Sequence, residues 1–185
     1  MLSTAELRDF IQEHFTRTAY RWERLPAYEV AFDGTEFARY LAGEPGPTPA
    51  RKQPCLDRLA AERAAGLYRH RVRLLHEPIT DYERYECEWG YVPNVAAGEG
   101  VRVLHVGEHR LPATLVEHDY WLIDDVHPLR MHYAADGTFE GATVEPELLE
   151  TYRQAREVAW ALAEPFCVWW GRHPELRCDA GRQTS

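Results

Sequence analysis

Residues 69–89 read R-H-R-V-R-L-L-H-E-P-I-T-D-Y-E-R-Y-E-C-E-W, and this stretch decides the architecture that the sequence predicts. Its first part alternates arginine with other side chains, which is the period of a β-strand. A turn is expected at Glu77-Pro78, and Thr80 with Glu83 forms a capping box that opens a short helix. A strand with a basic face is therefore expected to lead into a helix with an aromatic and acidic face.

The strand and the helix together present a candidate ligand site. Arg71 and Arg73 point from one face of the strand, and an arginine fork binds carboxylate or phosphate. Tyr82 and Glu86 lie on one stripe of the helix, and Asp81 lies on another edge. Either a polar small molecule is clamped between these groups, or arginine and glutamate form an internal ion pair. At least one of the arginines is expected within hydrogen-bonding reach of Glu86, Asp81 or a neighbouring acidic strand.

That acidic strand is D-Y-W-L-I-D at residues 119–124. Asp119 shares strand parity with Trp121 and Ile123, and both apolar side chains are expected in the core. A carboxylate near a core aromatic could have a raised pKa and act as an acid or base. The alternative is that Asp124, with the aspartate that follows it, ends the strand and opens a turn. The candidate ligand-binding residues are Arg71, Arg73, Asp81, Tyr82, Glu86, Asp119, Trp121 and Asp124, and no catalytic residue is assigned.

Hydrophobic spacing outside this centre predicts the remaining elements. Helices are expected at residues 4–19, after Asp33, at 55–65 and from Pro146 to about Trp169. Strands are expected at residues 28–32, 67–75, 101–106, 119–124, 129–133 and 138–144. Short connections favour an α+β fold with a curved antiparallel sheet (a meander), an N-terminal helical segment and a long C-terminal helix packed on it, all helices on one face. We expect one domain over residues 1–170 and a polar, flexible tail over 171–185.

Composition restricts the classes of partner. The net charge of -9 argues against direct binding to nucleic acid or to an anionic membrane. The four cysteines show no C-x-x-C spacing and are expected to be reduced thiols without a disulfide. The N-terminal residues show no signal-peptide pattern, and no apolar run is long enough to cross a membrane, so a cytoplasmic location is expected.

Signatures of common enzyme classes are missing from the sequence. There is no G-x-S-x-G elbow, no Walker A loop and no dinucleotide-binding glycine fingerprint. Several histidines between residues 105 and 132 could ligate a divalent metal together with Asp119 or Asp124, but their spacing matches no metal site, so loop histidines are the preferred interpretation. We therefore expect no metal and no cofactor, and the sequence favours a protein that is not an enzyme.

The run from Arg71 through Val144 resembles an actinobacterial single-domain family of unknown function. The residues that carry the resemblance are R-V-R-L-L-H-E-P-I-T-D-Y-E-R-Y-E, N-V-A-A-G-E-G-V-R-V-L, D-Y-W-L-I-D-D and M-H-Y-A-A-D-G-T-F-E-G, with R-W-E-R-L-P-A-Y upstream. Members of that family are often encoded near helix-turn-helix regulators, which implies a role in regulation or defence. The resemblance implies no activity and no catalytic residue.

Two functions remain as alternatives. The first is a binding or regulatory partner of a protein such as a helix-turn-helix regulator, because an acidic protein can cover a basic DNA-binding face. The second is an enzyme or sensor that binds a polar small molecule at the arginine, tyrosine, glutamate and aspartate residues named above. A deep pocket with strongly shifted pKa values would favour the second.

Overall fold

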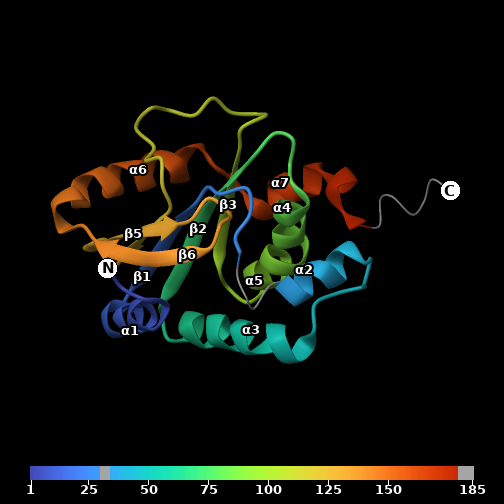
Figure 1. Cartoon of the computed structure of the whole chain (residues 1–185), viewed down its shortest axis with the longest axis horizontal. Coiled ribbons are helices and arrows are strands. Elements are labelled where there is room, and N and C mark those ends of the chain that lie inside the picture. Colours follow the sequence, from blue (N-terminus) through green and yellow to red (C-terminus); the bar gives the residue numbers. More distant parts are fainter. Residues whose placement is uncertain (30–33, 179–185) are drawn as a thin grey trace.

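The computed structural model describes residues 1–29 and 34–178, which form a seven-stranded sheet flanked by helices (Figure 1). The strands are β1 (Thr18–Glu23), β2 (Tyr68–Leu75), β3 (Gly100–His105), β4 (Tyr120–Ile123), β5 (His127–Tyr133), β6 (Phe139–Val144) and β7 (Glu164–Pro165). The helical segments are α1 (Thr4–His14), α2 (Gly34–Leu41), α3 (Pro49–Ala64), α4 (Asp81–Tyr85), η1 (Glu86–Tyr91), α5 (Val92–Ala96), η2 (Pro146–Leu148), α6 (Leu149–Leu162), α7 (Phe166–Arg172) and η3 (Pro174–Leu176). Across the sheet the strands follow the order β6-β5-β4-β1-β2-β3-β7.

The sheet is mixed, so the expectation of an antiparallel meander is wrong. β1 pairs in parallel with β2, and β2 pairs in parallel with β3, whereas the other neighbours are antiparallel. Parallel neighbours need a crossover of a dozen or more residues, which is usually helical. The chain provides both crossovers, because α2 and α3 lie between β1 and β2, and α4, η1 and α5 lie between β2 and β3. Among the described strands, only β4, β5 and β6 are antiparallel neighbours that also follow one another in the sequence, as in a meander.

Helices cover both faces of the sheet, not one face as expected. Tyr20, Val72 and Leu122 belong to the core that packs on α6, together with Tyr152 and Ala159 of that helix. The opposite face packs on α1 at the β4 side and on η1 and α7 at the β3 side. Figure 1 shows α6 on one side of the sheet and α1 and α3 on the other. The continuous apolar run of β4 fits burial on both faces.

Trp121 and Ile123 are confirmed as core residues, with exposed fractions of 7% and 0%. They contact the helix α1 through the apolar cluster that contains Leu7. The strand therefore has the side-chain parity that the sequence predicts.

Three element boundaries differ from the prediction for physical reasons. The first helix ends at His14, because residues 18–23 form the central strand β1. The helix expected at 55–65 already begins at Pro49, which occupies a first-turn position where its missing N–H costs nothing. The long C-terminal helix is interrupted at Ala163, whose extended backbone leads into β7 before α7 begins.

The strand expected at 28–32 lies partly outside the described residues, and the cap expected at Asp33 lies outside them. The expected tail begins within α7, and residues 179–185 are also outside them. The described residues, which include all four cysteines, contain no disulfide. Among them, no helix combines the length and apolar character needed to cross a membrane.

Candidate functional site

A buried ion-pair network occupies the sheet face that lies beneath η1 and α5. Arg71 on β2 lies at its centre, and its Nη1 donates to both carboxylate oxygens of Glu23 at 3.0 and 2.9 Å. Its Nε and Nη2 donate to one oxygen of Glu99 at 2.8 and 2.5 Å. Arg21 adds a second ion pair to Glu23 at 3.0 Å. Since the side chains of Glu23 and Glu99 are 2% and 1% exposed, the network is held out of water.

Arg73 is fully buried, with a side chain that is 0% exposed. Its Nη2 lies 2.8 Å from Oε2 of Glu86, which confirms the prediction that one of the strand arginines reaches a carboxylate. The two groups form an ion pair without hydrogen-bond alignment, and none of the Arg73 nitrogens has a hydrogen bond within the described part of the chain. The guanidinium also lies 5.2 Å from the ring centroid of Tyr28, at cation–π distance.

The helix that faces these arginines has an unusual turn. The expected capping box is confirmed, because the Thr80 hydroxyl accepts from the Glu83 N–H and the Glu83 carboxylate accepts from the Thr80 N–H. The helix then widens into a π-helix over Glu86–Tyr91 before α5 begins. π-Helical turns are rare in proteins, and those that occur often lie at functional sites. Here the turn carries Glu86 and Trp89, so it places a carboxylate and an aromatic ring above the arginines.

A cavity of about 360 Å³ opens between this turn and α3. Its lining contains the charged residues Glu36, Arg51, Lys52, Arg58, Arg71 and Glu86, the aromatic residues Tyr85, Trp89 and Tyr91, and also Pro47, Cys55, Gly90 and Asn94. The volume lies within the range of small-molecule sites. Two of the predicted site residues, Arg71 and Glu86, are therefore brought together at one cavity.

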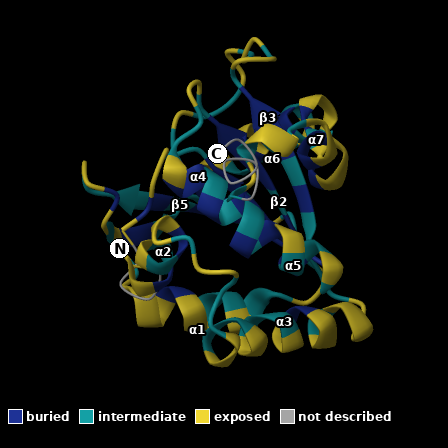
Figure 2. Ribbon diagram, turned by 90° about the vertical axis from the view of Figure 1, so that its right-hand side faces the viewer, coloured by how far each residue is buried: buried dark blue, intermediate teal, exposed yellow. Residues whose placement is uncertain are grey.

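The α3 wall of the cavity is polar. Arg51, Lys52, Cys55 and Arg58 recur at helical spacing and share one face. Leu59 is the single buried residue of α3, and Figure 2 shows exposed and intermediate colours along most of the helix. Because α3 packs little apolar surface, polar contacts contribute to its attachment.

A chain of hydrogen bonds joins the α3 wall to the buried network. Lys52 Nζ donates to Asn94 Oδ1 at 2.8 Å and to the Gly90 carbonyl at 3.2 Å. Asn94 Nδ2 in turn donates to Glu99 at 2.8 Å, and Glu99 accepts from Arg71. The positions of the cavity wall and floor are therefore coupled by direct polar contacts.

Two glutamates of this region have pKa values shifted in opposite directions. Burial favours the neutral acid of Glu23, but Arg21 and Arg71 outweigh burial and hold its pKa down at about 2. For Glu86, burial dominates over the attraction of Arg73, and the neighbouring charge of Glu23 adds to it, so the pKa is raised to about 7. Two carboxylates that share one set of cations behave in this way, because one ionises first and disfavours the second. Glu86 can therefore take up or release a proton near neutral pH.

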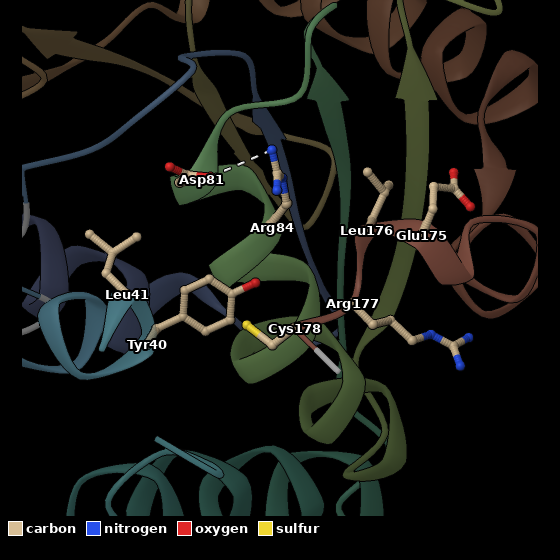
Figure 3. Close-up of a pocket in the computed structure, with 8 residues that line it drawn as sticks. All are labelled: Tyr40, Leu41, Asp81, Arg84, Glu175, Leu176, Arg177 and Cys178. Atoms are coloured by element: carbon tan, nitrogen blue, oxygen red, sulfur yellow. Dashed lines mark ion pairs between the residues drawn. The ribbon is translucent and has the colours of Figure 1, made fainter. Parts of the chain in front are cut away.

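Asp81 and Tyr82, two other predicted site residues, lie away from the cavity floor. Tyr82 is buried in an aromatic cluster, where its ring meets that of Phe37 at 5.4 Å. Asp81 is 62% exposed and pairs with Arg84 at 3.5 Å. Both Asp81 and Arg84 line a second cavity, of about 310 Å³, beside Tyr40 and the segment 175–178 (Figure 3). The charged groups of this second cavity are exposed or half-buried, so the cavity above Arg71 is the stronger candidate.

Asp119, Trp121 and Asp124 have separate places in the fold. Asp119 is 2% exposed, accepts from the Arg24 N–H at 3.0 Å and from the Tyr28 hydroxyl, and burial raises its pKa. It therefore belongs to the buried polar region but does not line the cavity. Trp121 packs under the guanidinium of Arg21, 5.3 Å from the ring centroid.

Asp124 forms part of the turn after β4, with a φ of 51°. Its carboxylate accepts from the backbone N–H groups of Thr16, Arg17 and Thr18 and from the Thr16 hydroxyl. These donors hold its pKa below the ordinary value, and they fix the start of β1. Asp124 therefore closes a turn and attaches the first strand.

Sequence reasoning missed most partners of Arg71. Glu23, Glu99, Asn94 and Lys52 were not among the predicted site residues, although Glu23 and Glu99 contact Arg71 directly, and Asn94 and Lys52 reach it through Glu99. The alternation in Y-R-W-E at residues 20–23 was an available signal of a strand. Within residues 1–29 and 34–178, no group of three or more His, Cys, Asp and Glu side chains is placed to hold a metal ion.

Residues 5–171 match a family described as a domain of unknown function, DUF6879. The chain belongs to this family. No curated protein matches the chain. A solved structure with a related arrangement is a phospholipase D family member, Nuc from Salmonella typhimurium, with 8% identity over 86% of this chain and 90% of that chain and a TM-score of 0.49. The family description carries no activity, and a structural likeness this slight carries no argument about function.

Proposed function

We propose that the protein is a cytoplasmic, small-molecule-binding regulatory protein, a sensor whose ligand occupies the cavity between α3 and η1. The observation that carries this proposal is the cavity of about 360 Å³ that exposes Arg71 and Glu86 of an otherwise buried ion network. Concave sites with a few convergent polar groups and shifted pKa values are the usual places for ligands.

Binding is supported more directly than catalysis. Nucleophilic catalysis by a thiol would pair it with a base, but the cavity's one thiol, Cys55, has the guanidinium of Arg58 as its contact, with Sγ and Nη2 3.8 Å apart. The floor, in contrast, is pre-organised, because Arg71 is fixed by Glu23 and Glu99 before any ligand arrives. Groups that are fixed in advance lose little entropy when a ligand binds.

Cys55 provides a built-in reporter for the test. It lines the cavity, whereas Cys167 is exposed on α7 outside it. The purified protein is treated with N-ethylmaleimide in the presence of a chemically diverse library of neutral, anionic and cationic small molecules. Mass spectrometry then gives the alkylation rate of Cys55 relative to that of Cys167 in the same molecules. We expect at least one compound class to slow alkylation at Cys55 alone and to raise the melting temperature.

A cavity-filling variant supplies the control. Gly90 lines the cavity, and a Cβ built there has the Glu86 Cβ, at 4.0 Å, as its nearest contact. Gly90→Leu should therefore occupy the cavity, keep the fold and abolish protection. Gly171→Leu is the matched change, because a Cβ at Gly171 meets nothing within 4 Å and that residue lies outside the cavity. If no compound protects Cys55, or if protection persists in Gly90→Leu, the proposal is wrong.

A second candidate is a protein partner such as a helix-turn-helix regulator. The net charge of -9 favours it, because an acidic surface is complementary to a basic DNA-binding face. The test is co-purification of the tagged chain with regulators encoded beside it, at low and at high salt. Retention at low salt and release at high salt would support this partner, and no retention at either salt would exclude it.

A further inference from the structure

The charges on the cavity wall do not balance, and their imbalance points to the chemistry of the ligand. The lining contains the cations Arg51, Lys52, Arg58 and Arg71 and two carboxylates, in a protein whose net charge is -9. Glu23 and Glu99 match Arg71 beneath the cavity, so the excess of positive charge lies on the α3 wall. A positive cavity in an acidic protein attracts and concentrates anions against the surrounding field. The excess of positive charge is therefore confined to the cavity and does not reflect the charge of the whole protein.

Both carboxylates of the lining already have partners. Glu36 accepts from the backbone and the hydroxyl of Thr48, each at 2.7 Å, and pairs with Arg39 at 3.6 Å and with Arg51 of the lining at 3.9 Å. Glu86 faces Arg73 at 2.8 Å, and its raised pKa makes it partly neutral near pH 7. Neither glutamate is therefore available to attract a cationic ligand with full strength.

Arg58 has no carboxylate partner among the described residues. It is exposed on α3, and its Nη2 donates to Cys55 Sγ at 3.8 Å. A guanidinium in this state can donate two parallel hydrogen bonds to a carboxylate or a phosphate. An anion bound beside it would lie next to the Cys55 thiol.

The opposite wall is aromatic. Trp89 and Tyr85 are adjacent, with ring centroids 6.0 Å apart, and Tyr91 continues the wall toward Arg71. Flat rings pack favourably against such a wall by stacked or edge-to-face contact. A ligand that spans the cavity would thus meet cations on the α3 side and aromatic surface on the η1 side.

We propose that the ligand of this cavity is a small molecule that joins an anionic group, carboxylate or phosphate, to a flat ring. The anionic group binds at Arg58 and its neighbours on α3, and the ring packs against Trp89. This inference rests on the function proposed above and specifies its ligand class. The shared chemistry could come from an aromatic acid or from a nucleoside monophosphate, and the experiment separates the two.

The test compares probes in the Cys55 alkylation assay at pH 7. Indole-3-carboxylate and adenosine 5′-monophosphate carry both groups, inorganic phosphate carries the anion alone, and adenosine carries the ring alone. We expect at least one of the first two to protect Cys55 more strongly than phosphate or adenosine, with protection that weakens as salt increases. The better of the two identifies the source of the anion.

Arg58→Ala and Arg110→Ala form the matched pair of variants. Both remove one exposed arginine, but Arg110 lies in the loop between β3 and β4 and does not line the cavity. Arg58→Ala should weaken protection roughly tenfold, and Arg110→Ala should leave it unchanged. The inference is overturned if adenosine or a cation such as tryptamine protects as well as the anionic probes, or if Arg58→Ala has no effect. If neither these probes nor any library compound protects Cys55, the proposed function itself fails.

Discussion

Replacing Arg71 by methionine tests whether the buried network has the energetics that its geometry implies. The change keeps an unbranched apolar stem, shorter than that of arginine, and removes the cation between Glu23 and Glu99. At a separation near 3 Å and an effective dielectric constant near 20, one such pair is worth roughly 5–6 kcal/mol before desolvation. Glu23 keeps Arg21 at 3.0 Å, but among the described side chains Glu99 keeps only the neutral amide of Asn94, at 2.8 Å. The loss is therefore that of one broken buried pair, about 3–5 kcal/mol.

Urea denaturation at pH 7, followed by tryptophan fluorescence, measures this loss as a change in the free energy of unfolding. Arg8→Met is the matched control, because Arg8 is 73% exposed, and it should leave the midpoint nearly unchanged. The double variant Arg71→Met with Glu99→Gln should cost less than Arg71→Met alone, because it removes the carboxylate that lost its partner. A loss below about 1 kcal/mol for Arg71→Met, or full additivity in the double variant, would refute the reasoning.

Three further outcomes are expected. The pKa of Glu86 is raised to about 7, so the folded chain keeps a proton that the unfolded chain releases above about pH 4.5. The contribution of Glu86 to the free energy of unfolding therefore decreases as the pH rises from 4.5 through 7. Glu86→Gln should therefore flatten this decrease in urea titrations at pH 5 and pH 8; an unchanged slope would contradict the raised pKa. Asp124→Ala should cost about 2–3 kcal/mol, measured by thermal unfolding, because it leaves three N–H groups at the start of β1 without their acceptor; a cost below 0.5 kcal/mol would contradict its role. Thiol titration should find Cys87 far slower than Cys167 in the folded protein, because Cys87 is 1% exposed and burial raises its pKa, and all four thiols should react after denaturation without reductant; a smaller count would reveal a disulfide.

Local chemistry predicted the elements that depend on neighbouring residues. The capping box at Thr80, the strand at 67–75 and the hairpin of β5 and β6 were all predicted at nearly their observed positions. In each case the signal and the structure lie within a few residues of one another. The Arg73–Glu86 pair was predictable for the same reason, because a short turn connects the strand to the helix.

Long-range pairing was not predictable from these signals. The first helix was expected to run to residue 19, and no strand was expected at residues 18–23. Without that strand, β2 had no parallel neighbour on that side, and the helical crossover between them could not be inferred. The partners of Arg71 depend on the same register: β1 places Arg21 opposite Arg71 and Glu23 opposite Arg73. Strand parity can be read from sequence, but the neighbour of each strand is decided by tertiary packing. The α3 wall of the cavity depends on the crossover in the same way.

The contrast between the two faces of the sheet supports a functional role for the network. Around β1 and β2 the face toward α6 is a largely apolar core that includes Trp22, Val72 and Leu74. The face toward η1 contains Arg21, Glu23, Arg71 and Arg73 on the same two strands. Buried ion pairs are often no more stabilising than apolar side chains of similar volume, so stability alone gives little reason to retain them. A ligand site whose floor carries fixed charges does require buried ion pairs to hold those charges in place, and this agrees with the sensor proposed here.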